Sequence, residues 1–564
     1  MICAIAFLFC AVIGRLFYVQ VLWGEQLQEK AIDQWTREIP VVATRGKITD
    51  RNGVILADNA DTYSVFARKK AIGDPEGTAK AIAKVLGLEE SAVYKRLTET
   101  VSSEVTVATH ISREQAENLS KENLPGVYYS RDNTRVYPYG DFLTQVLGFT
   151  SDDNMGQSGL EFRYNKYLKG INGEILYETD IVGVEIEGTT PTYRPATDGL
   201  NIRLTVDYEI QEIAERAMEE AYEIQKPKSA AVLIMDPGNG EILACSSKPS
   251  YDLNDVPRDD LTALNALSRN SLLSDSFEPG STFKIVTAAA NVEEYLNGNP
   301  KAFSEEHIFN SSRYRYVGGQ RVKCWSNHAN GKHSALNLQG ALENSCNPIF
   351  VDIALSLGTE TMYKYIEKLG FGSVTGVDFN GEAQGMILPS TAVKEVDLAR
   401  IGFGQTVAVT GIQMAAAMSA IVNGGVYYTP HFVKGIYASD NLVAEVIAPQ
   451  SKGRAISEQT SRIVTQMLEK VVAEGGGAQA YIEGYRVAGK TGTAQKYENG
   501  VIAAGKYVSS FIGCFPADDP QYLALVVIDE PEGEYYGSTV AAPYAKEIFE
   551  GIIKAKNIPR VNGG

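Results

Sequence analysis

A serine and a lysine three residues apart, Ser281 and Lys284, have the chemistry and the spacing of an activated nucleophile. The segment EPGSTFKIVTAAANVEEYL (278–296) predicts a helix that begins after Pro279 and Gly280. Residues i and i+3 share one face of a helix, so the lysine amine would lie beside the hydroxyl. A serine hydroxyl becomes nucleophilic when a neighbouring base takes its proton. Lys284 could be that base if burial and nearby positive charge lowered its pKa from about 10.4 towards neutrality.

A second pair of polar residues flanks Cys346 in the segment ENSCNPIF (343–350). Ser345 could pass a proton between Lys284 and a leaving group, and Asn347 could hydrogen-bond a substrate amide. Neither S-x-x-K nor S-x-N is specific alone, because each spacing arises often by chance. Their occurrence in this order, followed by a third motif, is what indicates a common site.

The third motif lies in YRVAGKTGTAQ (485–495) and allows two interpretations. With Gly484 in front, the segment matches the phosphate-binding pattern G-x-x-x-x-G-K-T. LALVVIDE (523–530) also resembles the strand that holds Mg²⁺ in nucleotide-binding proteins. Alternatively, Lys490-Thr491-Gly492 is the K-T-G motif of serine acyl-enzymes, and a second lysine would repel the charge on Lys284.

The surroundings of Lys490 decide between these interpretations. A phosphate-binding loop follows a buried strand and opens a helix, because amides at the helix N-terminus bind the phosphates. Here a glycine-rich, weakly apolar segment precedes Gly484, while Lys496, Asn499 and Gly500 follow the motif. That composition is typical of a strand and a turn, so we reject nucleotide binding.

Beyond residue 200 the pattern predicts one α/β (α+β) unit that could position these motifs. The expected elements are an amphipathic helix at 207–225, a hairpin at 229–247, strands at 507–515 and 521–530, and a closing helix at 541–556. Both ends of this unit should therefore build one mainly antiparallel sheet flanked by helices. The mostly helical middle, which holds the first two motifs, would be an insertion.

The first 24 residues are apolar apart from Arg15 and are long enough to span a bilayer as a helix. An uncleaved anchor is favoured over a signal peptide, because a basic leader and a small-residue cleavage site are absent. From there to about residue 200 we expect an elongated mixed α/β pedestal. Its expected features are a hairpin at 44–57, a helix at 74–99, a helix capped by Ser112, and a boundary at 188–199.

The composition excludes some classes of protein. The net charge of −17 and the pI near 5.0 argue against nucleic acid as a partner, because phosphate contacts need clustered lysine and arginine. Hydrophobic residues make up 44% of the 564 residues, as in ordinary globular proteins. Two of the six cysteines lie in the apolar N-terminal segment, which leaves too few for a disulfide scaffold.

With these motifs, the sequence resembles the class B penicillin-binding proteins, membrane-anchored D,D-transpeptidases of bacterial cell-wall synthesis. The resemblance covers nearly the whole chain, and is closest to the sporulation-specific and division-specific subtypes. The segments that resemble the family's pedestal motifs are RGKITDRNGVILA, RVYPYGDFLTQVLGF (135–149) and GLEFRYNKYLKGINGE (159–174). GFGQTVAVTGIQMA (402–415) resembles the family's segment between the second and third motifs. This resemblance implies an anchor at 1–24, a pedestal of the dimerisation type at 25–200 and a penicillin-binding transpeptidase domain at 201–560.

The resemblance also implies the chemistry of the site. Ser281 would attack the penultimate D-Ala of a stem peptide ending in D-Ala-D-Ala, and the N–H groups of Ser281 and Thr493 would stabilise the oxyanion. Lys490, Thr491 and Thr493 would hold the terminal carboxylate, and Gly492 would let the ligand approach the strand. β-Lactams would acylate Ser281. No cofactor is expected.

The resemblance further implies a location and a partner. The catalytic domain would lie outside the cytoplasm, on a single-pass anchor in the cell membrane. A glycan polymerase of the SEDS family would be its membrane partner. The rival functions are a serine β-lactamase and a β-lactam sensor of the same fold. A β-lactamase would need neither pedestal nor anchor, and a sensor would need a cytoplasmic signalling part.

Two cysteines near the second motif carry a separate hypothesis. Cys324, His328 and His333 have a spacing that a zinc site could use, but solvated loop histidines are the simpler interpretation and no metal is expected. In an oxidising compartment Cys324 and Cys346 could form a redox-sensitive bridge that gates activity. Such a disulfide would contribute about 3 kcal/mol. The alternative is two buried free thiols.

Overall fold

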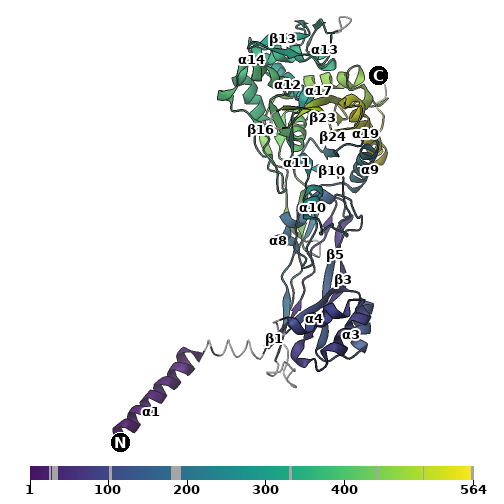
Figure 1. Ribbon diagram of the computed structural model, residues 1–564. Helices are drawn as coiled ribbons and strands as arrows, with labels where there is room; N and C mark the ends of the chain where they lie inside the picture. The colour runs from purple at the N-terminus through teal and green to yellow at the C-terminus, as the bar shows by residue number, and fades with distance from the viewer. Residues whose placement is uncertain are drawn as a thin grey trace.

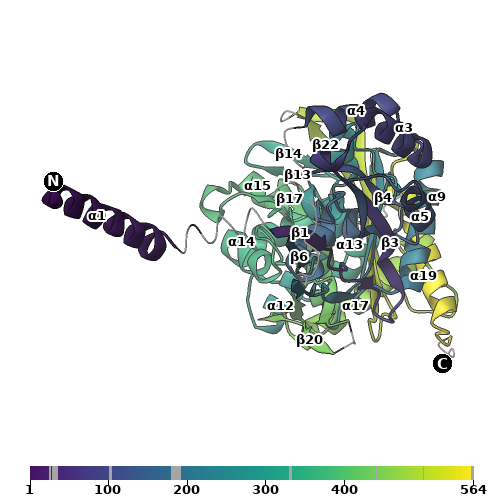
Figure 2. The same ribbon diagram turned by 90° about the horizontal axis from the view of Figure 1, so that it is seen from below.

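The computed structural model describes residues 1–24, 27, 36–100, 104–178, 192–328, 333–439, 442–498 and 501–560. The chain begins with the α-helix α1 (Ile2–Phe17), which continues as a π-helical turn (Tyr18–Leu22). Residues Ile5–Leu22 have a mean hydropathy of 2.1 and are long and apolar enough to cross a membrane. This helix stands apart from the rest of the described chain (Figures 1 and 2). Its length and composition support a membrane anchor.

An elongated pedestal lies between this helix and the C-terminal head (Figure 1). Its main sheet has the strand order β20-β19-β8-β2-β3-β4, and β5 also pairs with β3. The strands are β2 (Ile48–Thr49), β3 (Ile55–Arg68), β4 (Glu104–Ile111), β5 (Val127–Val136), β8 (Asn201–Leu204), β19 (Val433–Tyr437) and β20 (Val443–Val446). A smaller sheet contains β1 (Thr36–Val41), β6 (Gly173–Glu178) and β7 (Thr192–Arg194).

The pedestal confirms two local predictions and corrects a third. β2 and β3 form the predicted antiparallel hairpin, and Ser112 caps α5 (Arg113–Lys121) with a capping box. The helix predicted at 74–99 is wrong as a single element, because it divides into α3 (Pro75–Leu86) and α4 (Glu90–Glu99). Gly87 ends α3 in the left-handed conformation, with φ of 71°. Part of the predicted boundary, 188–191, lies outside the described residues.

Three pedestal segments meet at one buried ion cluster. Glu161 is fully buried, and its two carboxylate oxygens accept hydrogen bonds from Arg45 Nε at 2.7 Å and Arg135 Nε at 2.6 Å. Each of these residues comes from a different one of the segments quoted above. Arg45 also donates to the backbone oxygens of Asn154 and Glu161. The cluster therefore joins segments that are far apart in the sequence.

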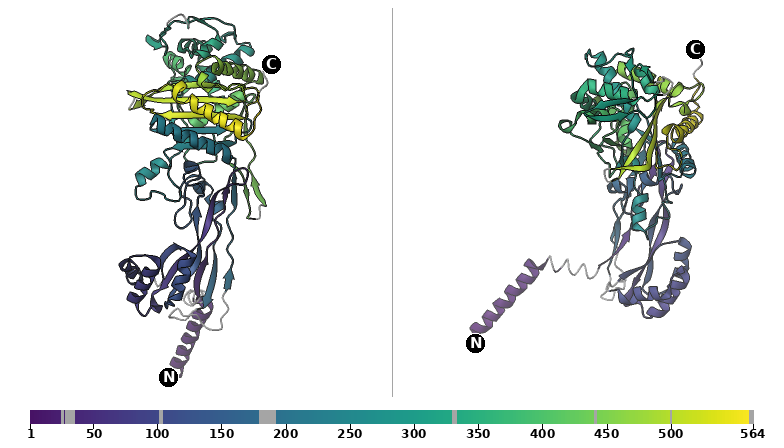
Figure 3. Two further views of the ribbon diagram at one scale, coloured as in Figure 1. Left: turned by 90° about the vertical axis from the view of Figure 1, so that its right-hand side faces the viewer. Right: turned by 45° about the horizontal axis from the view of Figure 1, so that its top comes forward.

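The head is built on an antiparallel sheet with the order β10-β9-β24-β23-β22. Its strands are β9 (Ser229–Met235), β10 (Ile242–Lys248), β22 (Ala488–Glu498), β23 (Val501–Phe515) and β24 (Tyr522–Asp529). Helices α9 (Tyr208–Gln225) and α19 (Ala542–Ala555) pack on one face and share an apolar core with it. The views in Figure 3 show this sheet within the head, above the pedestal. The predicted sheet, assembled from both ends of the domain, is confirmed.

A helical insertion covers the other face of the sheet and carries the main core. Its larger helices are α10 (Leu261–Leu267), α12 (Lys284–Leu296), α13 (Leu338–Glu343), α14 (Asn347–Lys368), α15 (Glu395–Ile401), α16 (Gly411–Val422) and α17 (Glu458–Ala473). Short strands lie between them, among them β14 (Gln320–Lys323), β15 (Ala335–Leu336) and β17 (Val407–Thr410). The sheet and this insertion together position the three motifs.

Candidate active site

The first motif starts on a tight turn that leads into α12. Ser281 lies in a 3₁₀ helix, Gly280–Phe283, and Lys284 is the first residue of α12. Gly280 has a φ of 55° and donates its N–H to Gly404 O at 2.9 Å. A Cβ on Gly404 would lie 2.0 Å from Gly280 O. The segment around Gly404 therefore supports the turn that presents Ser281, and only glycine allows this approach.

Lys284 links the first motif to the second. Its Nζ donates to Ser345 O at 2.7 Å and to Asn347 Oδ1 at 2.7 Å, and lies 3.0 Å from Ser345 Oγ. Within the described residues, no hydrogen bond joins Lys284 to the Ser281 hydroxyl. A neutral amine would use both hydrogens on the two carbonyl oxygens, leaving its lone pair free for a hydroxyl proton. Catalytic hydrogen bonds often tighten only when substrate binds.

The second motif is held in an uncommon backbone conformation. Ser345 has a φ of 49°, which non-glycine residues rarely adopt and which clusters at functional sites. It lies between α13 and α14, and Asn347 is the first residue of α14. Asn347 Nδ2 also donates to Lys323 O at 3.3 Å. This geometry directs Ser345 and Asn347 towards the lysine of the first motif.

Both lysines of the motifs are fully buried. Burial lowers the pKa of Lys284 to about 8, against smaller raising effects from Cys324 and Cys346. Burial, and then the charge of Lys284, hold the pKa of Lys490 well below its usual value. The expected repulsion between the two lysines thus lowers the pKa of Lys490 and not that of Lys284. Among the described residues, Lys490 Nζ has one acceptor, Thr491 O at 3.3 Å, whereas Lys284 Nζ contacts three oxygens. A proton shared between the two lysines is therefore held better by Lys284.

The third motif lies on β22, which is the edge strand of the head sheet. A strand at this position rules out the helix that a phosphate-binding loop would open. A Cβ on Gly492 would lie 2.5 Å from Ser510 Oγ and 3.0 Å from Pro279 O. The absence of a side chain at Gly492 thus allows the turn of the first motif to pack on β22. The sequence had instead predicted that this glycine makes room for a ligand. The Thr493 hydroxyl accepts a hydrogen bond from Gly537 N at 3.0 Å.

A cleft of about 530 Å³ opens between the motifs. Its wall includes Ser281, Ser345, Asn347, Thr491 and Thr493, while Lys284 and Lys490 lie buried behind it. Sequence reasoning missed other lining residues, which are Lys323, Trp325, Glu343, Asn344, Gln405, Gly476, Gln495, Tyr507, Tyr535, Tyr536 and Ser538. The adjacent tyrosines in EYYG (534–537) were an available signal, since paired aromatic residues in a loop often line a site.

The two cysteines also border this site. Cys324 lines the cleft, and Cys346 is buried between Ser345 and Asn347. Both are free thiols in this structure, so the redox bridge stays a prediction. A hydrogen bond from Cys346 lowers the pKa of Cys324, and the same contact raises the pKa of Cys346. His328 and His333 lie in the same cluster of side chains.

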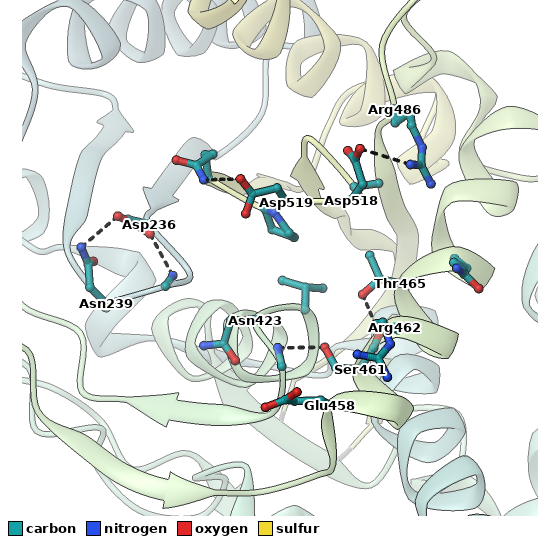
Figure 4. Close-up of a pocket in the computed structure, with 17 residues that line it drawn as sticks. Asp236, Asn239, Asn423, Glu458, Ser461, Arg462, Thr465, Arg486, Asp518 and Asp519 are labelled. Carbon is teal, nitrogen blue, oxygen red and sulfur yellow. Dashed lines mark hydrogen bonds and ion pairs between the residues drawn. The ribbon is translucent and has the colours of Figure 1, made fainter. Parts of the chain in front are cut away.

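A larger cavity, of about 790 Å³, lies elsewhere in the head (Figure 4). It shares no lining residue with the cleft and contains no residue of the three motifs. Several of its charged groups already have partners within the protein. Asp518 contacts Arg486 at 3.3 Å, and Asp236 accepts from Asn239 Nδ2 at 2.9 Å. Size alone therefore does not identify the site, and the motifs place it in the smaller cleft.

Comparison with known proteins agrees with this geometry. The penicillin-binding protein transpeptidase domain matches residues 230–550, and the penicillin-binding protein dimerisation domain matches residues 40–204. The chain is 41% identical over 553 residues to stage V sporulation protein D of Bacillus subtilis, covering 97% of this chain and 84% of the relative. It is 29% identical over 563 residues to the peptidoglycan D,D-transpeptidase FtsI of Escherichia coli K12, covering 98% and 90%.

Solved structures share the fold. A peptidoglycan synthetase from Bifidobacterium adolescentis matches with a TM-score of 0.75 at 27% identity, covering 94% of this chain and 98% of that chain. Penicillin Binding Protein 2X from Streptococcus thermophilus, at 23% identity, has a TM-score of 0.75 and covers 93% and 80%. The fold and the site thus define a penicillin-binding protein with a transpeptidase domain on a pedestal. More narrowly, the chain belongs to the class B penicillin-binding proteins.

Proposed function

We propose that this chain is a peptidoglycan D,D-transpeptidase that cross-links stem peptides through an acyl-enzyme on Ser281, and that β-lactams acylate the same residue. The observation that carries this proposal is the meeting of three motifs at one cleft. Their central contact is the buried Lys284 amine on Ser345 and Asn347.

The proposed reaction assigns one step to each of these groups. Neutral Lys284 takes the proton of Ser281 as its oxygen attacks the penultimate D-Ala carbonyl. The backbone N–H groups of Ser281 and Thr493 stabilise the oxyanion. The terminal D-Ala leaves with a proton delivered through Ser345. An amine from a neighbouring stem peptide then attacks the ester, forms the cross-link and releases Ser281.

Substrate binding uses the edge strand β22. Among the described strands, β22 pairs on one side only, so its other edge can accept an extended peptide as an additional strand. Thr491 and Thr493 bind the terminal carboxylate from the cleft wall, and Lys490 contributes charge from behind it. A carboxylate at this position raises the pKa of Lys490 and so recovers its positive charge. Asn347 binds an amide of the stem peptide.

The proposal extends to the whole chain. Residues 1–24 anchor it in the cell membrane, residues 25–200 form the pedestal, and residues 201–560 act outside the cytoplasm. The pairing of β19 with β8 means that the pedestal sheet also uses part of the catalytic sequence. A glycan polymerase of the SEDS family would supply the strands to be cross-linked, in septal or spore wall synthesis. No nucleic acid takes part.

Labelling with a fluorescent penicillin tests this function. We expect covalent label on the intact chain and on Ser390→Ala, which alters an exposed serine far from the motifs in the sequence, and none on Ser281→Ala. Label retained by Ser281→Ala would contradict the assignment. Rapid loss of label from the intact chain would indicate a β-lactamase.

A further inference from the structure

Four potential metal ligands gather beside the second motif. Cys324, His328, His333 and Cys346 each offer one ligand atom, and these four atoms lie within 4.8 Å of one another. Cys324 follows β14, His333 precedes β15, and Cys346 lies between α13 and α14. The fold thus gathers four residues from three separate places in the chain.

The histidines lack the hydrogen-bond partners that buried imidazoles usually have. His333 is 3% exposed, and its Nδ1 has no partner. Among the described residues, both ring nitrogens of His328 are also buried without a hydrogen bond of normal length, while contact with His328 helps to lower the pKa of the Cys324 thiol. The two rings stack with their centroids 4.5 Å apart. Buried polar groups are nearly always satisfied, so these orphaned nitrogens, which face two thiols, indicate a missing partner.

We propose that Cys324, His328, His333 and Cys346 bind one zinc ion. Two thiolates and two imidazoles are a common tetrahedral set for structural zinc. With bonds of about 2.0–2.3 Å, tetrahedral ligand atoms lie about 3.3–3.8 Å apart. The most widely separated pair of these atoms would need to approach by about 1.5 Å at most. Ser311 Oγ lies 3.2 Å from Cys346 Sγ and can donate to the metal-bound thiolate.

A disulfide explains less of the geometry. A bridge between Cys324 and Cys346 would use both thiols, yet would leave both ring nitrogens of His328 and Nδ1 of His333 buried without partners among the described residues. Zinc uses all four groups. It would also keep the two sulfurs as thiolates and protect them from oxidation.

The ion would fix one wall of the catalytic cleft, a consequence that rests on the proposed function. Cys346 separates Ser345 from Asn347, so a metal bond would hold the second motif in place. On the other side, Trp325 Nε1 donates to Asn344 O at 3.1 Å, and Lys323 O accepts from Asn347. Zinc would therefore fasten the loop after β14 to the segment that contacts Lys284. It completes no catalytic step.

Metal analysis of the full-length chain in detergent tests the site directly. After incubation with zinc and dialysis, we expect about one tightly bound zinc per chain. In place of zinc, cobalt(II) should give the visible spectrum of a tetrahedral site and a thiolate-to-metal band. Cys324→Ser and His333→Asn should each abolish bound metal and the cobalt spectrum. The controls Cys514→Ala and His307→Gln, outside the cluster, should retain both.

Absence of zinc from the intact chain, or retention by both ligand variants, would overturn the proposal. So would peptide mapping that finds Cys324 and Cys346 joined by a disulfide after zinc incubation. Penicillin labelling separates this proposal from the proposed function. Removing zinc with a chelator should slow acylation and adding it back should restore the rate, whereas failure of the proposed function would appear as label on zinc-loaded Ser281→Ala. An acylation rate unchanged by chelation would overturn the link to the cleft.

Discussion

The ion cluster of the pedestal and the two motif lysines of the head are both buried, but their charges are treated in opposite ways. In the pedestal, Arg45 and Arg135 share the carboxylate of Glu161 in close ion pairs. In the head, Lys284 and Lys490 are equally buried, yet among the described residues no carboxylate lies within ion-pair distance of either. The acceptors around Lys284 are neutral oxygens.

This difference separates a structural from a catalytic use of buried charge. A paired and hydrogen-bonded ion cluster joins segments and keeps its charges. A buried amine without a carboxylate partner binds its proton less tightly, as the lowered pKa of Lys284, about 8, indicates. Relative to an ordinary lysine, that shift corresponds to about 3 kcal/mol against the protonated form. Such a cost is typical of groups that must exchange protons.

Replacing Lys284 should reduce activity far more than stability. In Lys284→Met we expect acylation by penicillin to slow by about 10²–10⁴-fold, because the base for Ser281 is lost. The free energy of unfolding should fall by no more than about 1 kcal/mol, because methionine removes a poorly solvated cation. Acylation kinetics and thermal unfolding of the same preparation check both effects. A large loss of unfolding free energy in the same variant would show that Lys284 has a structural role like that of the Glu161 cluster.

Replacing Glu161 should have the opposite outcome. Glu161→Gln leaves two buried arginines without their carboxylate, which should cost about 3–5 kcal/mol of pedestal stability. The folded fraction should still be acylated at the normal rate, because the cluster lies outside the cleft. Glu117→Gln is a matched control, since its pair with Arg113 is solvent-exposed and its loss should leave the stability nearly unchanged. Equal thermal shifts in the two variants would contradict the structural role.

Local chemistry made much of the fold predictable. Apolar runs indicated β9, β10, β23 and β24, an amphipathic pattern indicated α9, and a capping serine indicated α5, because these signals lie within a few neighbouring residues. The three motifs were also local, so their residues could be named before their geometry was known. Gly87 was a readable helix terminator, and treating 74–99 as one helix overlooked it.

Long-range contacts were not predictable in the same way. β19 returns from the middle of the head sequence to pair with β8, and no local signal specifies that partner. The ion cluster of the pedestal likewise required three distant segments to meet. The orphaned nitrogens of His328 and His333 became evident only when burial and neighbours were known. Each case depends on tertiary packing, which overrides or adds to local preference.

The pH dependence of acylation tests whether the buried Lys284 amine is easily deprotonated, and it is the smallest of the effects expected here. Lys284 must be neutral to act as base, and its pKa is about 8, so the neutral fraction increases as pH rises. From pH 6 to pH 8 we expect acylation to accelerate about 50-fold and then to level off. The charged and titratable groups around it include Lys490, Cys324, Cys346 and His333. The profile should be measured with a penicillin that lacks ionisable groups in this range. A rate independent of pH across this window would show that Lys284 is already neutral, and the burial cost inferred above would then be too small.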